Sequence, residues 1–572
     1  MDMKQSIAQL IGQAVMRCYP DADGLLDDEA ASGYLEVPPE RDMGDYAFPC
    51  FRLSKALRQA PVQIAETLAE AISAPDLCEA RPMGGYLNFY FNRVNFARQT
   101  LREVLDSGDA YGGGQEGKTI CIDFSSINIA KRFHIGHLST TMIGHSLRRI
   151  YDFLGYHTIS INHLGDWGTQ FGKLISAYKH WGDRDHVERG GVEALTQLYV
   201  RFHDEAERDP SLEDEGRAWF KKIEDGDPEA IEIFNWFKTL TLRDTQRIYD
   251  MLGVTFDSYA GEAFYNDKMD RVIQELKAKN LLALSDGASI VDLDDCCMPP
   301  CLILKKDGAT LYATRDIAAA LYRKDTYHFD KCLYVVAYQQ DLHFRQWFKV
   351  VEKMGYDWAK DLIHVAFGMI SYEGQTLATR KGHVVYLEEL LSRAKEQALD
   401  IIREKSPDLD NPEEVAAQVG IGAVIYADLQ NNRIKDIDFW WDRALNFDGE
   451  TGPYVQYTHA RCCSVLRKAA TQDGPIVDAD YSGLSDDHAQ DILRLLSRFP
   501  EAVREAADRY EPSIVTRALT EIAKSYNKFY YEHRILDAEP VVREARLALT
   551  RAVKQILRMA LYLIGMDAPE RM

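Results

Sequence analysis

The stretch Thr119-Ile-Cys-Ile-Asp-Phe-Ser-Ser-Ile-Asn-Ile-Ala-Lys-Arg-Phe-His-Ile-Gly-His137 decides the fold that this 572-residue sequence predicts. Residues 119–124 form a short apolar run that is typical of a buried strand. A polar loop follows, then a helical stretch through Phe153, and then a second strand over 157–161. This order of strand, loop, helix and strand predicts the start of a parallel sheet that binds a nucleotide.

The loop from Ser125 to His137 carries the strongest chemical signal. It follows a strand and opens a helix, where free backbone N–H groups and the helix dipole favour an anionic phosphate. His134 and His137 flank Gly136, whose missing side chain lets a nucleotide approach the backbone, and imidazole N–H groups can stabilise charge on an α-phosphate. The alternative is a helix start that carries two histidines by chance, because HxGH alone is a weak pattern.

Changes in periodicity divide the chain into four regions. The first mixes helical and strand-like segments, the second contains the parallel sheet, and the last two are almost entirely helical. We therefore expect a multidomain protein that combines α/β and all-α parts. The expected boundaries are 1–112, 113–385, 386–446 and 447–572.

The parallel-sheet region contains an acidic insertion. Residues from about 180 to 290 are helical by pattern and rich in Trp and Phe. A second strand series begins near Ala288 and runs through 333–336 and 364–367. A sheet split by the insertion is the simplest interpretation of this order.

Net charge argues against a nucleic-acid partner, because 67 basic and 89 acidic residues leave a formal charge of −22. The distribution of the charge weakens this objection. Residues 181–300 contain 14 Lys and Arg against 27 Asp and Glu, whereas residues 451–572 contain 17 of each kind. The C-terminal fifth is therefore neutral and can present the local basic faces that phosphate contacts need.

The first residues, MDMKQSIAQLIGQAV, predict an amphipathic helix and lack the features of a secretion signal. No apolar stretch approaches the length that crosses a bilayer. The ten cysteines include no CxxC pair, so Cys296, Cys297 and Cys301 are interpreted as reduced packing residues, with a zinc site as the weaker alternative. We expect a cytoplasmic protein with no metal ligands and no membrane partner.

Six blocks of sequence, in order and over nearly the full length, resemble the arginyl-tRNA synthetase family. Ser125–Lys131 with the tetrad His134–His137 is similar to the family's ATP-site signature. The other blocks are Asn162–Gly172, Leu311–Ala318, Tyr334–His343, Phe447–Tyr457 and Ala568–Met572. The resemblance implies a class I synthetase with a Rossmann-like parallel-sheet catalytic domain, a small N-terminal α/β domain that binds the tRNA elbow, and a C-terminal helical anticodon-binding bundle.

The resemblance also implies a reaction. The carboxylate of L-arginine attacks the α-phosphate of ATP, supplied with Mg²⁺, to give arginyl-adenylate and pyrophosphate, and the terminal ribose of tRNA(Arg) then takes the arginine. Such chemistry needs positioning and charge stabilisation, not a covalent protein nucleophile. In this family tRNA binds before arginine is activated. We expect the protein to act as a monomer.

Asp316 is the residue expected to recognise arginine, because a carboxylate offers the paired acceptors that a guanidinium requires. Tyr312 lies one helical turn earlier on the same face. The alternatives for Asp316 are a solvated acid or an internal pair with Arg315. By resemblance, the remaining arginine-binding residues are Asp123, Ser126, Asn128, His137 and Gln340.

The second ATP loop departs from the family pattern. Thr376-Leu-Ala-Thr-Arg-Lys-Gly382 lacks the first lysine and the serine of a KMSKS-like loop, although Arg380 and Lys381 remain to meet phosphates. Lys131, three residues before His134, is expected to supply the missing charge. The alternative is a surface lysine and slow activation.

The resemblance gives the ATP contacts as His134, Gly136, His137 and Met369. Ile127 and Ser139 stand where the family usually has proline and arginine, which leaves the detailed geometry of the loop open.

Eight positions resemble the family's tRNA contacts. Tyrosines suit this role because unstacked bases stack on aromatic faces, on the order of 1–3 kcal/mol each. The alternative is tyrosines that pack between helices with their polar tips exposed. The positions are Tyr86, Asn88, Tyr454, Tyr457, Arg461, Tyr526, Tyr530 and Met572, with Arg467 and Lys468 as candidate phosphate ligands.

Two rival functions remain. One is a class I synthetase for another amino acid, such as glutamine or cysteine. The other is a synthetase-like tRNA-binding protein that has lost catalysis, which the degraded second loop permits. Intact His134, His137 and Asp316 argue against the second rival.

Overall fold

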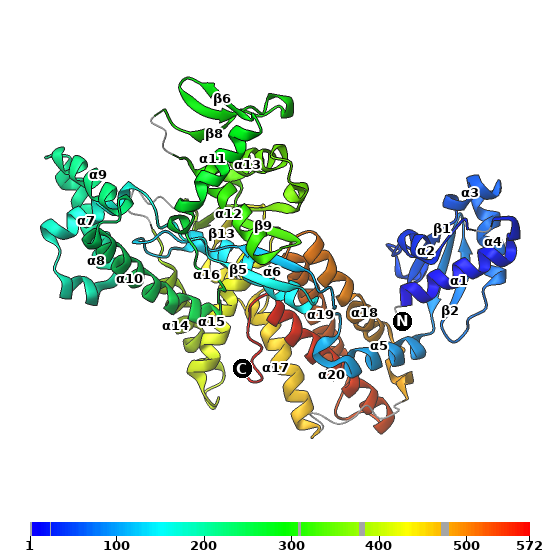
Figure 1. Ribbon diagram of the computed structural model, residues 1–572. Helices are drawn as coiled ribbons and strands as arrows, with labels where there is room; N and C mark the ends of the chain where they lie inside the picture. The colour runs from blue at the N-terminus through cyan, green and yellow to red at the C-terminus, as the bar shows by residue number, and fades with distance from the viewer. Residues whose placement is uncertain (1–2, 23, 307–309, 377–383, 471–479) are drawn as a thin grey trace. The chain divides into compact units, whose positions relative to one another are not determined.

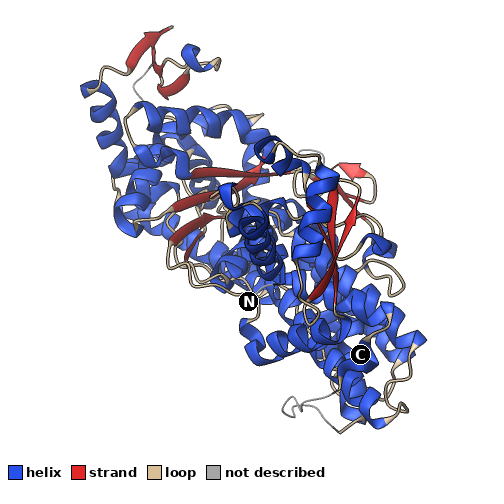
Figure 2. Cartoon of the chain, turned by 90° about the vertical axis from the view of Figure 1, so that its right-hand side faces the viewer, coloured by secondary structure: helices blue, strands red, loops and turns tan. Residues whose placement is uncertain are grey.

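The computed structural model describes residues 3–22, 24–306, 310–376, 384–470 and 480–572 (Figure 1). The chain divides into two compact units. The first comprises Met1–Gly108, Lys468–Ser497 and Lys528–Ala552, and the second comprises Asp109–Arg467, Arg498–Asn527 and Val553–Met572. Helices make up most of the described chain (Figure 2).

The first unit contains a three-stranded antiparallel sheet of order β1-β3-β2. Its strands are β1 (Tyr46–Pro49), β2 (Cys78–Met83) and β3 (Tyr86–Phe91). Helix α4 (Pro61–Ala71) packs on β2 and β3, and α1 (Met3–Cys18) packs on α4. The predicted N-terminal helix and the predicted mixture of helices and strands in this region are therefore confirmed. The remaining helices before Asp109 are α2 (Asp28–Tyr34), α3 (Phe51–Leu57) and α5 (Arg93–Ser107).

The second unit is built on a four-stranded sheet of order β10-β9-β4-β5, in which every neighbouring pair is parallel. Its strands are β4 (Thr119–Asp123), β5 (His157–Ile161), β9 (Lys331–Ala337) and β10 (Leu362–Phe367). Helix α6 (Leu138–Phe153) connects β4 to β5 and packs on both. The predicted strand, loop, helix and strand are confirmed.

Two helices and a shared apolar core cover this sheet. Helix α12 (Tyr312–Tyr327) leads into β9, and α13 (Asp341–Lys353) leads into β10. Their residues Ile317 and Trp347 are completely buried in one cluster with Cys332 of β9. Parallel strands are typically buried in this way, because their crossover helices lie on the faces of the sheet. The carboxyl ends of β4, β5 and β9 consequently meet at one edge.

The strand predicted near Ala288 forms, but it does not join the parallel sheet. It is β7 (Ala288–Val291), which pairs antiparallel with β6 (Leu282–Ser285) and β8 (Cys301–Leu304) in a separate small sheet. The prediction that it opens the second half of the main sheet is wrong. A short apolar run specifies a strand but not its partner. A third small sheet holds β11 (Ile370–Tyr372), β12 (Gln375–Thr376) and β13 (Ile437–Phe439).

The acidic insertion is mostly helical, as predicted, although β6 lies within its predicted bounds, and the region from Leu387 onward is mostly helical as well. None of the described helices is both long and apolar enough to cross a membrane. Helices of the insertion and its approach are α7 (Thr169–Trp181), α8 (Arg184–Ala206), α9 (Ser211–Glu224), α10 (Pro228–Leu252) and α11 (Met269–Ala278). The later helices are α14 (Leu387–Lys405), α15 (Pro412–Leu429), α16 (Trp441–Ala444), α17 (Gly452–Lys468), α18 (Asp487–Asp508), α19 (Ser513–Glu532) and α20 (Pro540–Leu563).

Candidate active site

The loop that leaves β4 has a strained backbone. Ser125, Ser126 and Ala130 have φ angles of 70°, 45° and 60°, a region that residues other than glycine rarely occupy. Side chains of neighbouring elements hold it there: Thr140 Oγ1 accepts the Ser125 N–H at 3.0 Å, and Thr241 Oγ1 accepts the Ala130 N–H at 3.0 Å. Strain that the surroundings maintain in this way marks a loop shaped for binding.

The histidines of the tetrad cap the helix that they open. His134 Nδ1 accepts the Gly136 N–H at 3.1 Å, and His137 Nδ1 accepts the His134 N–H at 3.2 Å. Because His134 Nδ1 acts as an acceptor, the neutral His134 ring carries its proton on Nε2 and can donate it, whereas His137 Nδ1 also lies 3.3 Å from the His134 carbonyl. The two ring centroids lie 4.0 Å apart, and Phe133 stacks on His137 with centroids 5.0 Å apart.

Burial keeps both imidazoles neutral. It lowers the pKa of His137 to about 3, with a smaller contribution from His134. Burial and the neighbouring charge of Lys131 also lower the pKa of His134. The pair therefore offers neutral N–H donors at pH 7, and the charge of Lys131 acts on His134.

Asp123 ends β4 and is almost completely buried. Its carboxylate accepts the Ser126 hydroxyl at 2.9 Å and pairs with the Arg323 guanidinium at 2.7 Å. Arg323 comes from α12, is 1% exposed, and also lies 3.3 Å from His163 Nδ1. Two of the residues predicted to bind arginine, Asp123 and Ser126, are thus in contact, and Arg323 fixes the orientation of Asp123.

Asp316 lies on α12 one turn after Tyr312, as predicted. Its Oδ2 is 2.6 Å from His343 Nε2, and both side chains are 28% exposed. The predicted alternative of a pair with Arg315 is wrong, because Arg315 instead contacts Glu262 at 3.2 Å. Burial, opposed in part by Arg315, raises the pKa of Glu262 to about 7. Tyr312 is 68% exposed, so its ring is available to a ligand.

Two further residues that are predicted to bind arginine, Gln340 and Asn128, follow strands β9 and β4 of the main sheet. Gln340 is exposed and lies in the turn between β9 and α13. Asn128 is exposed, and its loop pairs with Gly165, where a Cβ would approach Asn128 Oδ1 to 2.3 Å. A side chain at position 165 would therefore displace the Asn128 side chain from the place that it occupies.

Met369 follows β10, and its backbone is fixed between Asp436 and Ile437. Its side chain is 40% exposed. Arg380 and Lys381 lie outside the described residues. The segment that follows them is bonded to the tetrad: Ile135 donates to the Val385 carbonyl at 2.9 Å, and Leu387 donates to the Phe133 carbonyl at 3.0 Å.

The predicted tRNA contacts of the first unit differ in exposure. Tyr86 is 36% exposed and packs edge-on against Phe51. Asn88 is only 4% exposed, and its side-chain N–H donates to the Met43 carbonyl at 2.7 Å. In this structure Asn88 therefore stabilises a loop and is not displayed at the surface. Tyr530 is 37% exposed.

The predicted tRNA contacts of the second unit also differ in how exposed their side chains are. Tyr457 on α17 is 41% exposed, and the Arg461 guanidinium lies over its ring at 4.9 Å. Tyr454 is partly buried on the same helix, whereas Tyr526 is completely buried, which favours the packing alternative for its ring. Met572 packs against the apolar cluster of α14 and α15. Arg467 donates to the Glu570 carbonyl at 3.0 Å, and Lys468, the last residue of α17, already belongs to the first unit.

Sequence reasoning missed Arg323, His343 and Glu262. Arg323 is seven residues after Asp316, which places both on one face of α12. His343 is the last residue of the block Tyr334–His343, which resembles the family, but no role was assigned to it from the sequence. No pattern identified Glu262. The cysteines near 300 behave as packing residues in part: Cys301 is buried, Cys296 is partly buried and Cys297 is exposed.

Three family models match the chain. Residues 100–441 match "tRNA synthetases class I (R), catalytic domain", residues 455–572 match "DALR anticodon binding domain", and residues 2–91 match "Arginyl tRNA synthetase N terminal domain". Together these matches cover most of the sequence.

Curated relatives and solved structures agree with these models. The arginine–tRNA ligase of Alkaliphilus metalliredigens is 53% identical, and the alignment covers 100% of both chains. That of Clostridioides difficile is 53% identical over 98% of this chain and 99% of the relative. The structure of Thermus thermophilus arginyl-tRNA synthetase matches with a TM-score of 0.81 and 25% identity over 100% of both chains.

Proposed function

The chain belongs to the arginyl-tRNA synthetase family, and we propose how its described residues activate L-arginine with ATP and charge tRNA(Arg). Its fold is that of a class I synthetase with a helical anticodon-binding region and an N-terminal domain. The established activity therefore follows from family membership. The assignment of individual residues is the proposal.

We propose that Asp316 selects arginine. The single observation that carries this assignment is a partly buried carboxylate on α12 whose one oxygen is already oriented by His343. A guanidinium presents a planar fork of N–H donors that matches a carboxylate, whereas neutral citrulline would leave the acid without a charge partner. Tyr312 and Gln340 line the approach to the same carboxylate.

At the other end of the amino acid, Asp123 and Ser126 hold the α-amino group, and Asn128 and His137 meet the carboxylate. Asp123 suits an ammonium partner because Arg323 fixes its position beside Ser126. The substrate carboxylate then attacks the α-phosphate in line, and pyrophosphate leaves. Since both reactants are held in place, catalysis rests on orientation.

His134, Gly136 and His137 stabilise the α-phosphate as its charge redistributes. Neutral imidazole N–H donors suit this role, because they bind oxygen without forming an ion pair that would hold the product. Lys131 adds a positive charge beside the tetrad, and Met369, Arg380 and Lys381 complete the nucleotide contacts. The ribose hydroxyl of bound tRNA then attacks the adenylate carbonyl and releases AMP.

Magnesium enters as the ATP complex. Within the described residues, no group of three His, Cys, Asp or Glu side chains converges at the tetrad, so the phosphates of ATP would supply most of the ligands. The ion neutralises phosphate charge when it is bound.

The tRNA contacts follow the exposed residues. The residues proposed to contact the anticodon loop are Tyr457 with Arg461, Tyr454 and Tyr530. The residue proposed to contact the tRNA elbow is Tyr86. Asn88, Tyr526 and Met572 would act through the packing around them, because their side chains are wholly or partly buried. We also propose that the protein is a cytoplasmic monomer, with domains at 1–112, 113–385, 386–446 and 447–572.

Aminoacylation of tRNA(Arg) by the purified chain tests the proposal, with each of the standard amino acids offered in turn. We expect only arginine to be charged, and Asp316→Asn to lower kcat/KM for arginine by at least about 100-fold, since it leaves a buried guanidinium unpaired. Arginine-dependent pyrophosphate exchange should occur only with tRNA present. If the protein binds tRNA(Arg) but makes no arginyl-tRNA, the assignment of these catalytic residues is wrong.

A further inference from the structure

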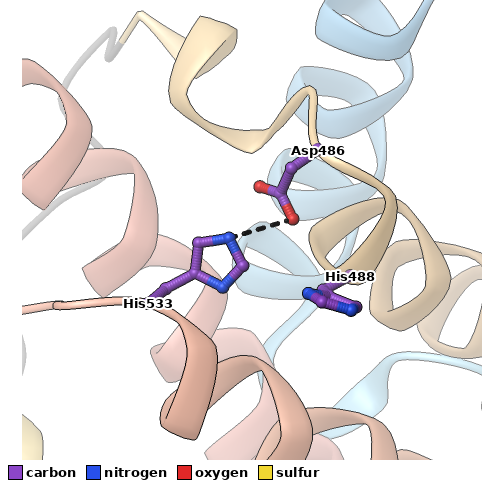
Figure 3. A group of neighbouring side chains, drawn as sticks. All are labelled: Asp486, His488 and His533. Carbon is purple, nitrogen blue, oxygen red and sulfur yellow. Dashed lines mark ion pairs between the residues drawn. The ribbon is translucent and has the colours of Figure 1, made fainter.

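Three potential metal ligands converge in the first unit, far from the catalytic residues in sequence. Asp486, His488 and His533 place their ligand atoms within 4.8 Å of one another (Figure 3). Asp486 immediately precedes α18, His488 lies in its first turn, and His533 follows the last residue of α19. All three side chains are partly buried. Among the described residues, no other three-residue group of this kind occurs.

The His533 ring is oriented as in a metal-binding histidine. Its Nδ1 lies 3.2 Å from the Phe529 carbonyl, which can only accept, so Nδ1 carries the proton. The neutral ring then has its lone pair on Nε2, which lies 3.4 Å from Asp486 Oδ1. Phe529 also stacks on the ring with centroids 4.6 Å apart. A carbonyl behind one ring nitrogen is the usual support of a ligating imidazole.

Asp486 is held independently of the histidines. Its Oδ1 accepts the Ala489 N–H at 3.0 Å and so caps α18. Arg93 holds the residues on either side of Asp486 in place, because it donates to the Ser485 carbonyl at 2.7 Å and pairs with Asp487 at 2.8 Å. The carboxylate therefore keeps its place whether or not an ion is present, and the site is partly preorganised.

The third proposed ligand is the ring of His488. The His488 and His533 ring centroids lie 5.6 Å apart with their planes at 84°, so the rings approach edge to face and are not stacked together. The positive charge of Arg546 lies near the group and opposes the binding of a cation. Burial lowers the pKa of Arg546, and the negative charge of Asp486 counteracts this shift, so the two side chains interact. An ion must therefore bind strongly enough to compete with a guanidinium.

We propose that Asp486, His488 and His533 bind one divalent transition-metal ion of the Zn²⁺ class. Two imidazoles and a carboxylate are a ligand set typical of zinc, and they disfavour Mg²⁺ and Ca²⁺, which prefer oxygen ligands. Partial exposure leaves a position for water. The ion joins the start of α18 to the chain that follows α19, and it therefore stabilises this end of the first unit.

The other interpretation of these contacts is an ion pair between protonated His533 and Asp486. The two interpretations differ in the role of His488, which an ion pair does not need.

The test is a Zn²⁺ titration of the full-length, metal-stripped protein at pH 7.5, in competition with a chromogenic chelator. We expect one tight equivalent of Zn²⁺. His488→Ala, His533→Ala and Asp486→Asn, which retains the helix cap, should each weaken the affinity at least about tenfold, the loss that follows even from removing a supporting group. The matched control is His180→Ala, which removes the exposed His180–Glu215 pair at 2.8 Å and should leave the affinity unchanged.

Two further measurements, of Co²⁺ absorption and of melting temperature, test the metal site even if one variant folds poorly. Co²⁺ should produce visible d–d absorption in the wild-type protein that is lost in His488→Ala. Zn²⁺ should raise the melting temperature of the wild-type protein, and this shift should disappear in Asp486→Asn. No tight equivalent in the wild-type protein, or equal Zn²⁺ affinity in wild type and His488→Ala, would overturn the proposal. Mg²⁺ should give no shift.

Discussion

The Nε2 atom of His343 lies 2.6 Å from the Oδ2 atom of Asp316, and the two residues come from the consecutive helices α13 and α12. A carboxylate that receives a guanidinium needs a fixed plane, because the two hydrogen bonds form only in one orientation. By occupying one oxygen, His343 sets that plane. It is therefore proposed as a positioning residue.

Replacing His343 with Ala should raise the KM for arginine about tenfold, since a hydrogen bond to a charged group contributes about 1.5–3 kcal/mol. The KM for ATP should not change. His343→Gln, which keeps a side-chain N–H, should recover part of the loss. Steady-state aminoacylation with arginine and ATP varied separately measures both constants. An unchanged KM for arginine in His343→Ala would show that Asp316 is oriented by other groups.

Removing either tetrad imidazole should slow the activation of arginine. We expect His134→Ala and His137→Ala to lower the rate of tRNA-dependent pyrophosphate exchange by about 10²–10³, the usual effect of losing a donor to transition-state charge. His157→Ala, an exposed histidine at the start of β5, is the control. Because burial lowers the pKa of His137 to about 3, this residue should cause no inflection in the rate between pH 5.5 and 8. An inflection that disappears in His137→Ala would contradict this expectation.

Exposed and buried tyrosines should separate tRNA binding from stability. Tyr457→Ala should weaken tRNA(Arg) binding by about 1–3 kcal/mol through lost stacking and leave the melting temperature unchanged. Tyr526→Ala should instead destabilise the fold by about 3–5 kcal/mol, because it removes a fully buried ring. Fluorescence binding and thermal unfolding distinguish the two. Equal tRNA affinity of Tyr457→Ala and wild type would remove Tyr457 from the interface.

Asp428 should destabilise the protein at alkaline pH. It is 4% exposed and accepts the Ser139 hydroxyl at 2.6 Å, and burial raises its pKa to about 7. An unfolded carboxyl group titrates near pH 3.9, so the folded state binds this proton more tightly, and the free energy of unfolding falls as pH rises from about 4 to about 7. Asp428→Asn should increase stability by about 1–3 kcal/mol at pH 8, and by less at pH 5. Thermal unfolding at both values measures the difference, and equal effects at the two values would contradict the assignment.

His459 should have the opposite dependence. It is 1% exposed, its Nδ1 lies 3.0 Å from the Pro569 carbonyl, and burial lowers its pKa to about 4. An unfolded histidine titrates near pH 6.5, so the unfolded state binds more protons, and stability falls as pH decreases from about 6.5 to about 4, by up to about 3 kcal/mol. His459→Gln keeps a donor for Pro569 and should flatten this decline in urea unfolding between pH 7 and 5. An unchanged slope would assign the acid sensitivity to other groups.

The main sheet could be predicted from local sequence because β4 is a short apolar run, β5 alternates polar residues with isoleucine, and a helical pattern separates them. The spacing of Tyr312 and Asp316 likewise needs only the period of a helix. The contacts of Asp123 with Arg323 and of Asp316 with His343 depend on how α12 and α13 pack, and periodicity contains no information about packing between elements. The same limit explains why β7 was assigned to the wrong sheet.

The hydrogen bonds from Ile135 to Val385 and from Leu387 to Phe133 pair two segments like adjacent β-strands. Successive side chains of such a segment point to opposite sides, so a register shift of one residue reverses all of them. Substitution of Val385 should consequently be tolerated far better than insertion or deletion of a single residue between 384 and 387. The length of this connection, more than its composition, is therefore what keeps residues 384–387 in register with the histidine tetrad.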